Sequence, residues 1–202
     1  MVRSASILLL LVSTLAFGQK NSTQLTGDDI IRKGLIRAQG TISPGWDISG
    51  GKTNIYIQGD CEYYVHRNVS IKGDISYFLD TQGDGYLKHN HSLFFGAQYH
   101  FPIKRFDPYI GFSPGASLIQ ARNPATATPE IDVPYGESIL KVSPAISVST
   151  GFNFFVWKYL HFMANVKYVH AKHAAEWGTQ YALNEFRISF GVGWNVNAMR
   201  KK

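Results

Sequence analysis

Cysteine is nearly absent from this sequence, since the 202 residues contain only Cys61. A single thiol excludes an intramolecular disulfide and leaves no cysteine-rich metal site. Long apolar runs are also missing. Beyond the N-terminal stretch no 18 consecutive apolar residues occur, so the sequence predicts no transmembrane helix there. The net charge is +6, but apart from the tail Arg200–Lys202 the cations are dispersed, which argues against nucleic-acid binding.

The N-terminal stretch has the pattern of a signal peptide. Arg3 supplies a positive charge, an apolar run begins at Ile7–Val12, and Ala16-Phe17-Gly18 offers small residues for cleavage. About eleven apolar residues are too few to cross a bilayer as a helix. No cysteine follows for lipid attachment. We therefore expect residues 1–18 to be a cleavable signal peptide, residues 19–33 to be a periplasmic lead segment, and the protein to leave the cytoplasm.

The rest of the chain alternates between apolar and polar residues with a period of two. In the last such segment Phe186, Ile188 and Phe190 alternate with Arg187 and Ser189. Successive side chains of a strand point to opposite faces, so this pattern predicts strands with one apolar and one polar face. Eight segments show it: 36–46, 54–65, 69–79, 93–101, 110–118, 142–154, 160–168 and 185–195.

The links between these segments are short and long in turn. Short links are expected at 66–68, 102–107 and 156–158, and longer ones at 47–53, 80–90, 120–138 and 171–182. Outer-membrane barrels have short periplasmic turns and longer outer loops. The sequence therefore predicts an all-β fold: an eight-stranded antiparallel up-and-down transmembrane β-barrel with short periplasmic turns and longer extracellular loops, spanning residues 34–196. A basic C-terminal tail, residues 197–202, follows it.

The apolar face could turn inward, as in a soluble lipocalin-like barrel, or outward into lipid. Charges on the polar faces favour a narrow polar lumen, because opposite charges can pair there between glycines and serines. This predicted lumen charge cluster comprises Arg37, Asp60, Glu62, Lys72, Asp74, Lys167, Glu185 and Arg187. We expect it to be a salt-bridged plug, with a narrow ion pathway as the alternative. Aromatic residues near two short turns predict an interfacial girdle of Tyr99, Phe101, Phe106, Tyr109, Phe154, Trp157 and Tyr159.

The C-terminal segment resembles the recognition signal of outer-membrane barrels. Ser189, Gly191, Trp194 and Val196 occupy its polar, glycine, aromatic and hydrophobic positions. The glycine-rich stretch 110–115 is also similar to strands of this class. From about Gly34 to Val196 the chain resembles the OmpA/OmpX-like eight-stranded outer-membrane barrel proteins, including the small β-barrel-domain proteins of Bacteroidetes-type bacteria. The resemblance implies that barrel-assembly machinery reads these four residues and that periplasmic chaperones escort the chain.

Histidines near the outer strand ends are the candidates for catalysis. His89, His91, His170 and His173 flank the long loops, and Ser92 follows His91 as a possible nucleophile. Convergence of imidazoles from two loops would suit a metal. Neither spacing matches a lipid-modifying enzyme motif, so we interpret these as rim histidines. The stretch Asp80–Gly85 lacks the closing glutamate of a calcium loop and predicts a turn.

The functional expectation is an outer-membrane barrel without enzymatic activity, cofactor or metal. It would contribute to envelope structure or to surface interactions through its outer loops, of which 120–138 is the longest. Its expected partners are outer-membrane lipid, lipopolysaccharide and the assembly factors, and no extracellular partner is identified. A narrow porin-like channel and an enzyme that modifies lipids with rim histidines are the alternatives.

Overall fold

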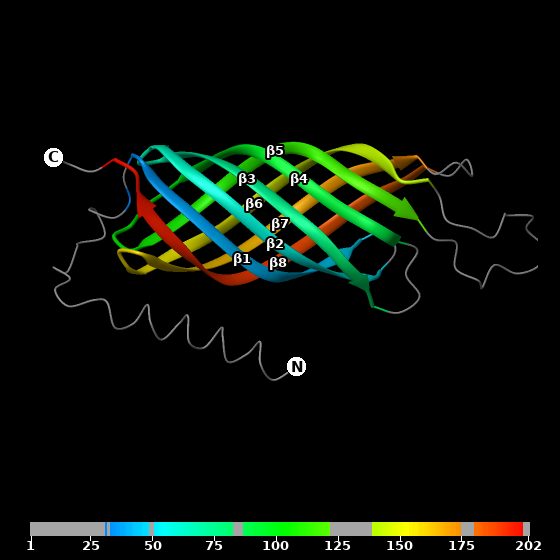
Figure 1. Cartoon of the computed structure of the whole chain (residues 1–202), viewed down its shortest axis with the longest axis horizontal. Helices are drawn as coiled ribbons and strands as arrows, with labels where there is room; N and C mark the ends of the chain where they lie inside the picture. The colour runs from blue at the N-terminus through cyan, green and yellow to red at the C-terminus, as the bar shows by residue number, and fades with distance from the viewer. Residues whose placement is uncertain are drawn as a thin grey trace, which may run out of the picture.

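The chain folds into a closed barrel of eight antiparallel strands, each hydrogen-bonded to the next and β1 to β8 (Figure 1). The computed structural model describes residues 31, 33–48, 51–82, 87–121, 139–174 and 180–199. No helix within these ranges is long and apolar enough to cross a membrane. The strands are β1 (Leu35–Asp47), β2 (Thr53–His66), β3 (Val69–Thr81), β4 (Leu87–His100), β5 (Phe106–Ala121), β6 (Lys141–Trp157), β7 (Leu160–Ala174) and β8 (Gln180–Asn197).

This architecture confirms the predicted fold, but several strands run further than the alternation indicated. β4 begins at Leu87 and β8 at Gln180, inside the predicted long links 80–90 and 171–182. At the other end the predicted link 102–107 shortens, because Phe106 and Asp107 pair with Phe154 and Asn153 on β6. Backbone pairing with a neighbouring strand therefore continues where the side-chain alternation is already irregular.

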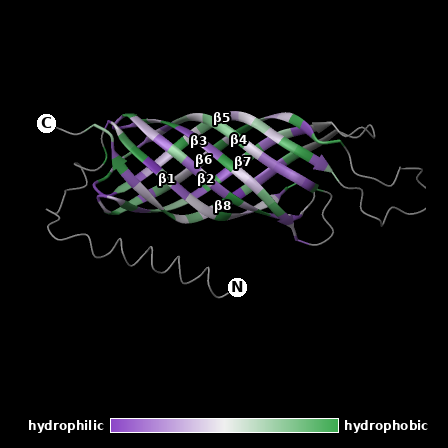
Figure 2. Cartoon of the chain, viewed as in Figure 1, coloured by the Kyte–Doolittle hydropathy of each residue, from purple (hydrophilic) through white to green (hydrophobic). Residues whose placement is uncertain are grey.

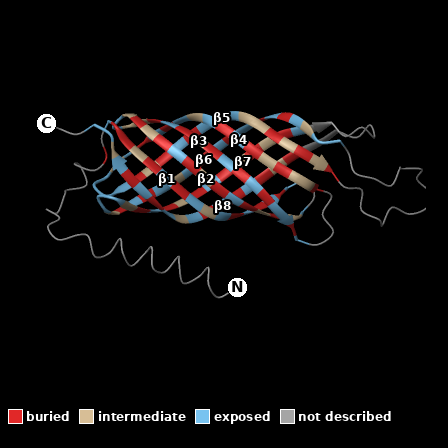
Figure 3. Ribbon diagram, in the orientation of Figure 1, coloured by how far each residue is buried: buried red, intermediate tan, exposed pale blue. Residues whose placement is uncertain are grey.

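Side-chain exposure alternates along every strand whose side chains are described (Figure 3). In β3, for example, Asp74 and Ser76 are buried while Ile75 and Tyr77 are more than half exposed. The exposed positions are largely apolar (Figure 2). Among strand residues with described side chains, the charged ones that are not buried lie at the loop end: Asp80, Lys88, Lys141 and Lys172. The middle of the barrel thus presents an uncharged, apolar outer surface.

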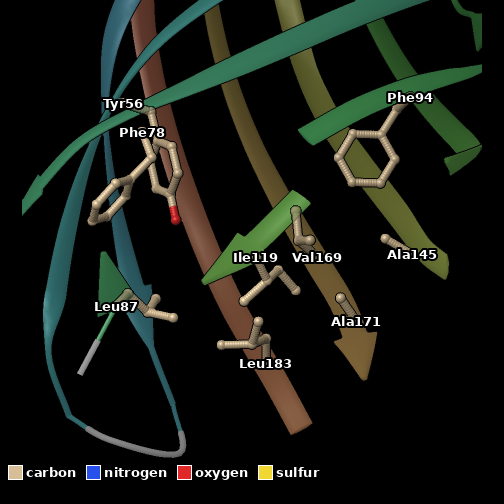
Figure 4. Packing of buried hydrophobic residues seen from close by; sticks show 9 residues of the cluster. All are labelled: Tyr56, Phe78, Leu87, Phe94, Ile119, Ala145, Val169, Ala171 and Leu183. Carbon is tan, nitrogen blue, oxygen red and sulfur yellow. The ribbon is translucent and has the colours of Figure 1, made fainter. Parts of the chain in front are cut away.

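The interior carries an apolar cluster at each end. At the end of the long loops, residues from seven strands pack together, with the rings of Tyr56 and Phe78 edge to face at 5.7 Å (Figure 4). At the end of the short turns, Ile31, Leu35, Tyr64 and Phe155 form a second cluster. The backbone N–H of Gly34, whose φ is +86°, donates to the carbonyl of Tyr64. This contact holds the segment that leads into β1 against the mouth of the barrel.

β4 and β5 approach each other closely at two glycines, Gly96 on β4 and Gly115 on β5, each of which lies against the backbone of the other strand. A Cβ atom on Gly115 would lie 2.2 Å from the carbonyl oxygen of Leu93, and one on Gly96 would lie 2.1 Å from that of Phe112. Real Cβ atoms do not come this near to backbone atoms. A glycine without such a neighbour is Gly73, where an added Cβ would meet only the ring of Phe95, at 3.8 Å.

Candidate functional site

All eight residues of the predicted lumen charge cluster lie inside the barrel, each at most 8% exposed. The period-two geometry of the strands places them there, because their apolar neighbours in sequence face outward. Four cations and four carboxylates are thereby brought into one low-dielectric space, where each charge requires a partner. The structure arranges them in groups at successive heights along the lumen.

The middle group spans the barrel from wall to wall. Lys167 on β7 donates from Nζ to Asp74 Oδ1 on β3 at 2.5 Å, and both side chains are at most 2% exposed. In an eight-stranded ring β3 and β7 are four strands apart in either direction, so they form opposite walls. The Lys167 ammonium also lies 5.6 Å from the centre of the Phe94 ring. The pair and this ring occupy the lumen at that level.

The group nearer the long loops centres on Arg187. Its Nε donates to Glu185 Oε2 at 2.8 Å and its Nη1 to Ser92 Oγ, on the opposite wall, at 2.9 Å. Its guanidinium stacks over the Tyr56 ring at 3.9 Å. The Tyr56 hydroxyl and the Asn54 amide both donate to Glu185 at 2.9 Å. The carboxylate therefore has a donor from each of several directions, as a buried charge requires.

The group nearer the short turns surrounds His100. Glu62 pairs with Arg37, which lies directly opposite on β1, and its Oε1 is 2.8 Å from His100 Nε2. The other ring nitrogen of His100 is 3.0 Å from Asp107 Oδ2, to which the Tyr64 hydroxyl donates at 2.6 Å. One imidazole thus joins two buried carboxylates.

A fourth pair completes the predicted cluster. Lys72 Nζ lies 3.6 Å from Asp60 Oδ2, which also accepts from the Gln39 amide at 2.9 Å. The Lys72 ammonium is 5.9 Å from the centre of the Tyr109 ring. Each carboxylate of the cluster is therefore paired with a cation of the same cluster.

Sequence reasoning missed several aromatic residues and two acids of the lumen, Asp47 and Asp107. Tyr56, Phe94 and Phe155 are buried inside, and none of them had been assigned to the interior. These two acids lie in the predicted links 47–53 and 102–107, although continuing the alternation of β1 from Ser43 and of β5 from Gly111 places both inside. Tyr109 had been assigned to the girdle, and this prediction is wrong. It is 2% exposed, and its hydroxyl accepts a hydrogen bond from Asn165 at 2.6 Å. Because Ile110 faces outward, its neighbour Tyr109 must face inward, even though Tyr109 lies near a turn.

The remaining predicted girdle residues, Tyr99, Phe101, Phe106, Phe154, Trp157 and Tyr159, are exposed at the short-turn end. The rings of Tyr99 and Phe101 contact each other edge to face, with centres 5.0 Å apart. Trp46, Tyr77 and Phe186 are likewise exposed towards the long-loop end. The apolar outer surface is therefore flanked by aromatic side chains at both ends, the arrangement typical of barrels in membranes.

The rim histidines whose side chains are described, His89, His91 and His170, do not form a catalytic arrangement with Ser92. His91 lies on the outer surface, where it stacks on Tyr77 with ring centres 4.3 Å apart and near His89 at 5.4 Å. Ser92 faces the lumen and bonds to Arg187, so the strand itself separates it from His91. His170, on β7, contacts Asn184 instead. The side chain of His173 lies outside the described residues.

No described group of three or more histidine, cysteine, aspartate or glutamate side chains could hold a metal ion. The Asp80–Gly85 stretch falls partly outside the described residues, at 83–85. A cavity of about 10 Å³ adjoins the loop-side group and is lined in part by Asn90, Ser117 and Arg187. Such a space holds about one water molecule. Ser117 Oγ and Arg187 Nη2 have no protein partner there, which suits a bridging water.

The four residues of the expected assembly signal lie along β8. Ser189 faces inward and donates to Ser43 Oγ at 2.9 Å, while Trp194 and Val196 are exposed on the outer surface at the short-turn end. Gly191 lies close to the carbonyl oxygen of Gly40 on β1. Their recognition by assembly machinery stays a prediction. Residues 1–18, nearly all of the lead segment 19–33, and 200–202 lie outside the described residues.

No family model matches the sequence, and no curated protein does either. Among solved structures, the N-terminal β-barrel domain of Pseudomonas aeruginosa OprF is similar at 14% identity, covering 82% of this chain and 99% of its own, with a TM-score of 0.56. Neisserial surface protein A matches at 13% identity, 81% and 96% coverage and a TM-score of 0.56. The outer membrane protein OprG of P. aeruginosa matches at 14% identity, covering 83% of this chain and 98% of its own, with a TM-score of 0.55. The chain therefore has the fold of eight-stranded outer-membrane barrels.

Proposed function

We propose that this chain is an integral outer-membrane protein whose barrel is a closed, non-enzymatic scaffold, and that it supports the envelope or carries surface interactions through its outer loops. The observation that carries the proposal is the Lys167–Asp74 pair, which joins opposite walls at the middle of the lumen. The side chains of this pair and of Phe94 lie together in the lumen at this level, and the interior of an eight-stranded barrel is just wide enough to be filled by side chains. A scaffold without an internal pathway acts through its surfaces.

The outer surface supports insertion into lipid. Large apolar side chains such as Ile75, Phe95 and Phe190 are more than half exposed, and the charged strand residues that are not buried lie at the loop end. In water this surface would be an aggregation hazard, whereas in a bilayer it is the stable arrangement. Lys88, Lys141 and Lys172 at the loop end would face the phosphates of lipopolysaccharide in the outer leaflet.

The first experiment tests insertion. Membrane-extracted protein is run in SDS with and without boiling, and the cell envelope is fractionated in parallel. A closed membrane barrel resists cold SDS and changes mobility on boiling. The proposal expects this shift together with recovery in the outer-membrane fraction. Recovery of unshifted protein in the soluble periplasmic fraction would contradict it.

The second experiment separates a scaffold from a channel. Purified barrel in a planar bilayer should give no stepwise conductance in 1 M KCl, with purified porin as the positive control. Regular single-channel steps that persist after repurification would favour the channel. A mass shift of lipid A that depends on the protein and is lost in the His91→Ala variant would instead favour the enzyme.

The third experiment addresses the loops. A strain that lacks the protein is complemented with the full chain or with a chain in which residues 123–137 are replaced by a short Gly-Ser linker. If the loops carry the function, the shortened barrel loses surface adhesion but restores detergent resistance. If the barrel has only an envelope role, the two chains complement equally. Failure of the full chain to restore either property would contradict both roles.

A further inference from the structure

The short-turn end of the barrel is a ring of exposed cations. Arg67 lies in the β2–β3 turn, Lys104 and Arg105 in the β4–β5 turn, and Lys158 in the β6–β7 turn, and all four are exposed. Lys33, also exposed, lies where the chain enters β1, beside the end of β8. Because β1–β8 follow one another around the barrel, these positions recur at every second strand.

Among the described residues at the same end, no exposed carboxylate lies near Lys33, Lys104, Arg105 or Lys158. The described residues at this end contain one acid, Asp107, and it is buried. These residues are 31, 33–36, 64–71, 98–108, 153–162 and 194–199. The long-loop end differs, because there Asp80 is exposed beside the lysines. Within the described residues the short-turn end therefore carries a cationic rim, defined here as Lys33, Arg67, Lys104, Arg105 and Lys158.

One residue of the rim occupies a conformation that its side chain does not favour. Lys104 has a φ of +56°, in the left-handed region where glycine and asparagine are usual. The turn is tight, with Ile103 and Phe106 hydrogen-bonded to each other across it. A lysine is less favourable than glycine at this position, because its Cβ atom crowds the following carbonyl oxygen. The position projects a charge from the tip of the turn, and such strain commonly marks a functional site.

The rim lies directly beside apolar and aromatic side chains. Ile103, Trp157 and Tyr159 are exposed within the same turns, and the Lys158 ammonium is 5.2 Å from the centre of the Tyr159 ring. Aromatic rings of this kind occupy the headgroup level of a bilayer. Ammonium and guanidinium groups next to them are therefore placed at the depth of lipid phosphates.

We propose that the cationic rim selects anionic phospholipid headgroups in the leaflet that borders the short turns, so that the barrel is surrounded there by lipids such as phosphatidylglycerol. The inference rests on the proposed insertion into a membrane. Basic groups near an anionic lipid surface contribute about 1 kcal/mol each, which corresponds to a preference of about fivefold for a lipid in contact with one of them. High salt weakens the preference, since the Debye length falls to about 3 Å at 1 M.

The test measures the lipid composition next to the rim. Trp157 and Trp194 both lie at this end, where each pairs with Leu160, whereas Trp46 lies at the other. In a Trp46→Phe/Trp177→Phe background the fluorescence therefore reports on the short-turn end. The barrel is reconstituted in phosphatidylcholine vesicles that contain 20 mol% phosphatidylglycerol. In separate samples either phosphatidylglycerol or phosphatidylcholine carries bromine on its acyl chains. The bromine quenches the fluorescence of nearby tryptophan, so the extent of quenching in the two samples gives the fraction of each lipid next to the short-turn end.

Two variants and a matched control accompany the parent protein. The rim variant carries Arg67→Gln, Lys104→Gln, Arg105→Gln and Lys158→Gln. The control removes four cations from the loop end by Lys52→Gln, Lys88→Gln, Lys141→Gln and Lys172→Gln, so both lose the same charge. The milder variant Lys104→Asn removes one charge from the rim, and asparagine suits the left-handed backbone at this position. It therefore still tests the role of the rim if the fourfold variant does not fold.

At low salt the parent and the loop-end control should prefer phosphatidylglycerol over phosphatidylcholine about fivefold. In 1 M NaCl this preference should almost disappear. The rim variant, which keeps Lys33, should lose most of the preference, and Lys104→Asn a smaller part of it. Equal quenching by the two lipids in the parent, or an unchanged preference in both rim variants, would overturn the proposal. A parent without the heat-dependent SDS mobility shift would instead overturn the membrane insertion itself, so the two failures are distinguishable.

Discussion

Separating Lys167 from Asp74 should destabilise the barrel strongly, whereas removing both should not. At 2.5 Å and an effective dielectric constant of about 20, the attraction between the two charges is about 7 kcal/mol before the cost of burying them. Loss of one partner from a buried pair typically costs about 3–5 kcal/mol, because the remaining charge is left unpaired. Replacement of both by apolar side chains removes that penalty.

The two single variants should not be equal. Asp74 also interacts favourably with Lys72 and Arg187, so Lys167→Met leaves the carboxylate partly compensated. Those same cations repel Lys167, so Asp74→Leu leaves the ammonium facing two like charges. We expect the free energy of unfolding to fall by about 3 kcal/mol in Lys167→Met and by about 5 kcal/mol in Asp74→Leu. In the double variant it should stay within about 2 kcal/mol of the parent value.

The assay is equilibrium unfolding in urea with lipid vesicles present, followed by tryptophan fluorescence. The double-mutant cycle should give a coupling energy above about 3 kcal/mol. The matched control combines Asp74→Leu with Lys158→Met, an exposed lysine on a turn, and should be additive within about 0.5 kcal/mol. A coupling energy for the buried pair below about 1 kcal/mol would refute the idea that this contact closes the lumen.

Three further predictions test other parts of the barrel. Ile75→Arg puts a charge on the proposed lipid face and should cost about 2–4 kcal/mol in vesicles, whereas on a soluble barrel it would be close to neutral; unfolding in urea decides. Gly115→Ala should reduce the refolded fraction on cold SDS gels because of its contact with backbone, whereas Gly73→Ala should match the parent; equal yields would contradict the close approach of β4 and β5. His100→Ala leaves two buried carboxylates short of a donor and should cost about 2–4 kcal/mol, against less than 0.5 kcal/mol for the exposed His66→Ala; similar urea midpoints for these two variants would show that His100 is dispensable.

Much of the fold follows from the sequence, because side-chain alternation is a local property. A strand with outward Ile188 must turn Arg187 and Ser189 inward, whatever the rest of the chain does. The existence of all eight strands and the faces of most of their residues were therefore predictable, although Tyr109 was placed on the wrong face. The strand ends were less so, since pairing at Leu87 and Phe106 depends on a neighbouring strand rather than on the residue itself.

The sequence by itself determined which charges enter the lumen, and only the tertiary structure decided which of them meet. Asp74 and Lys167 are 93 residues apart, and closing the ring places their strands on opposite walls. Glu62 could pair with any nearby cation until register set Arg37 opposite it. The inward direction of Tyr109 follows from the alternation, but its donor Asn165, which is 56 residues away, is brought to it only by the closed barrel. The physical reason is that alternation fixes a direction for each side chain, whereas contact requires the register and curvature of the whole barrel.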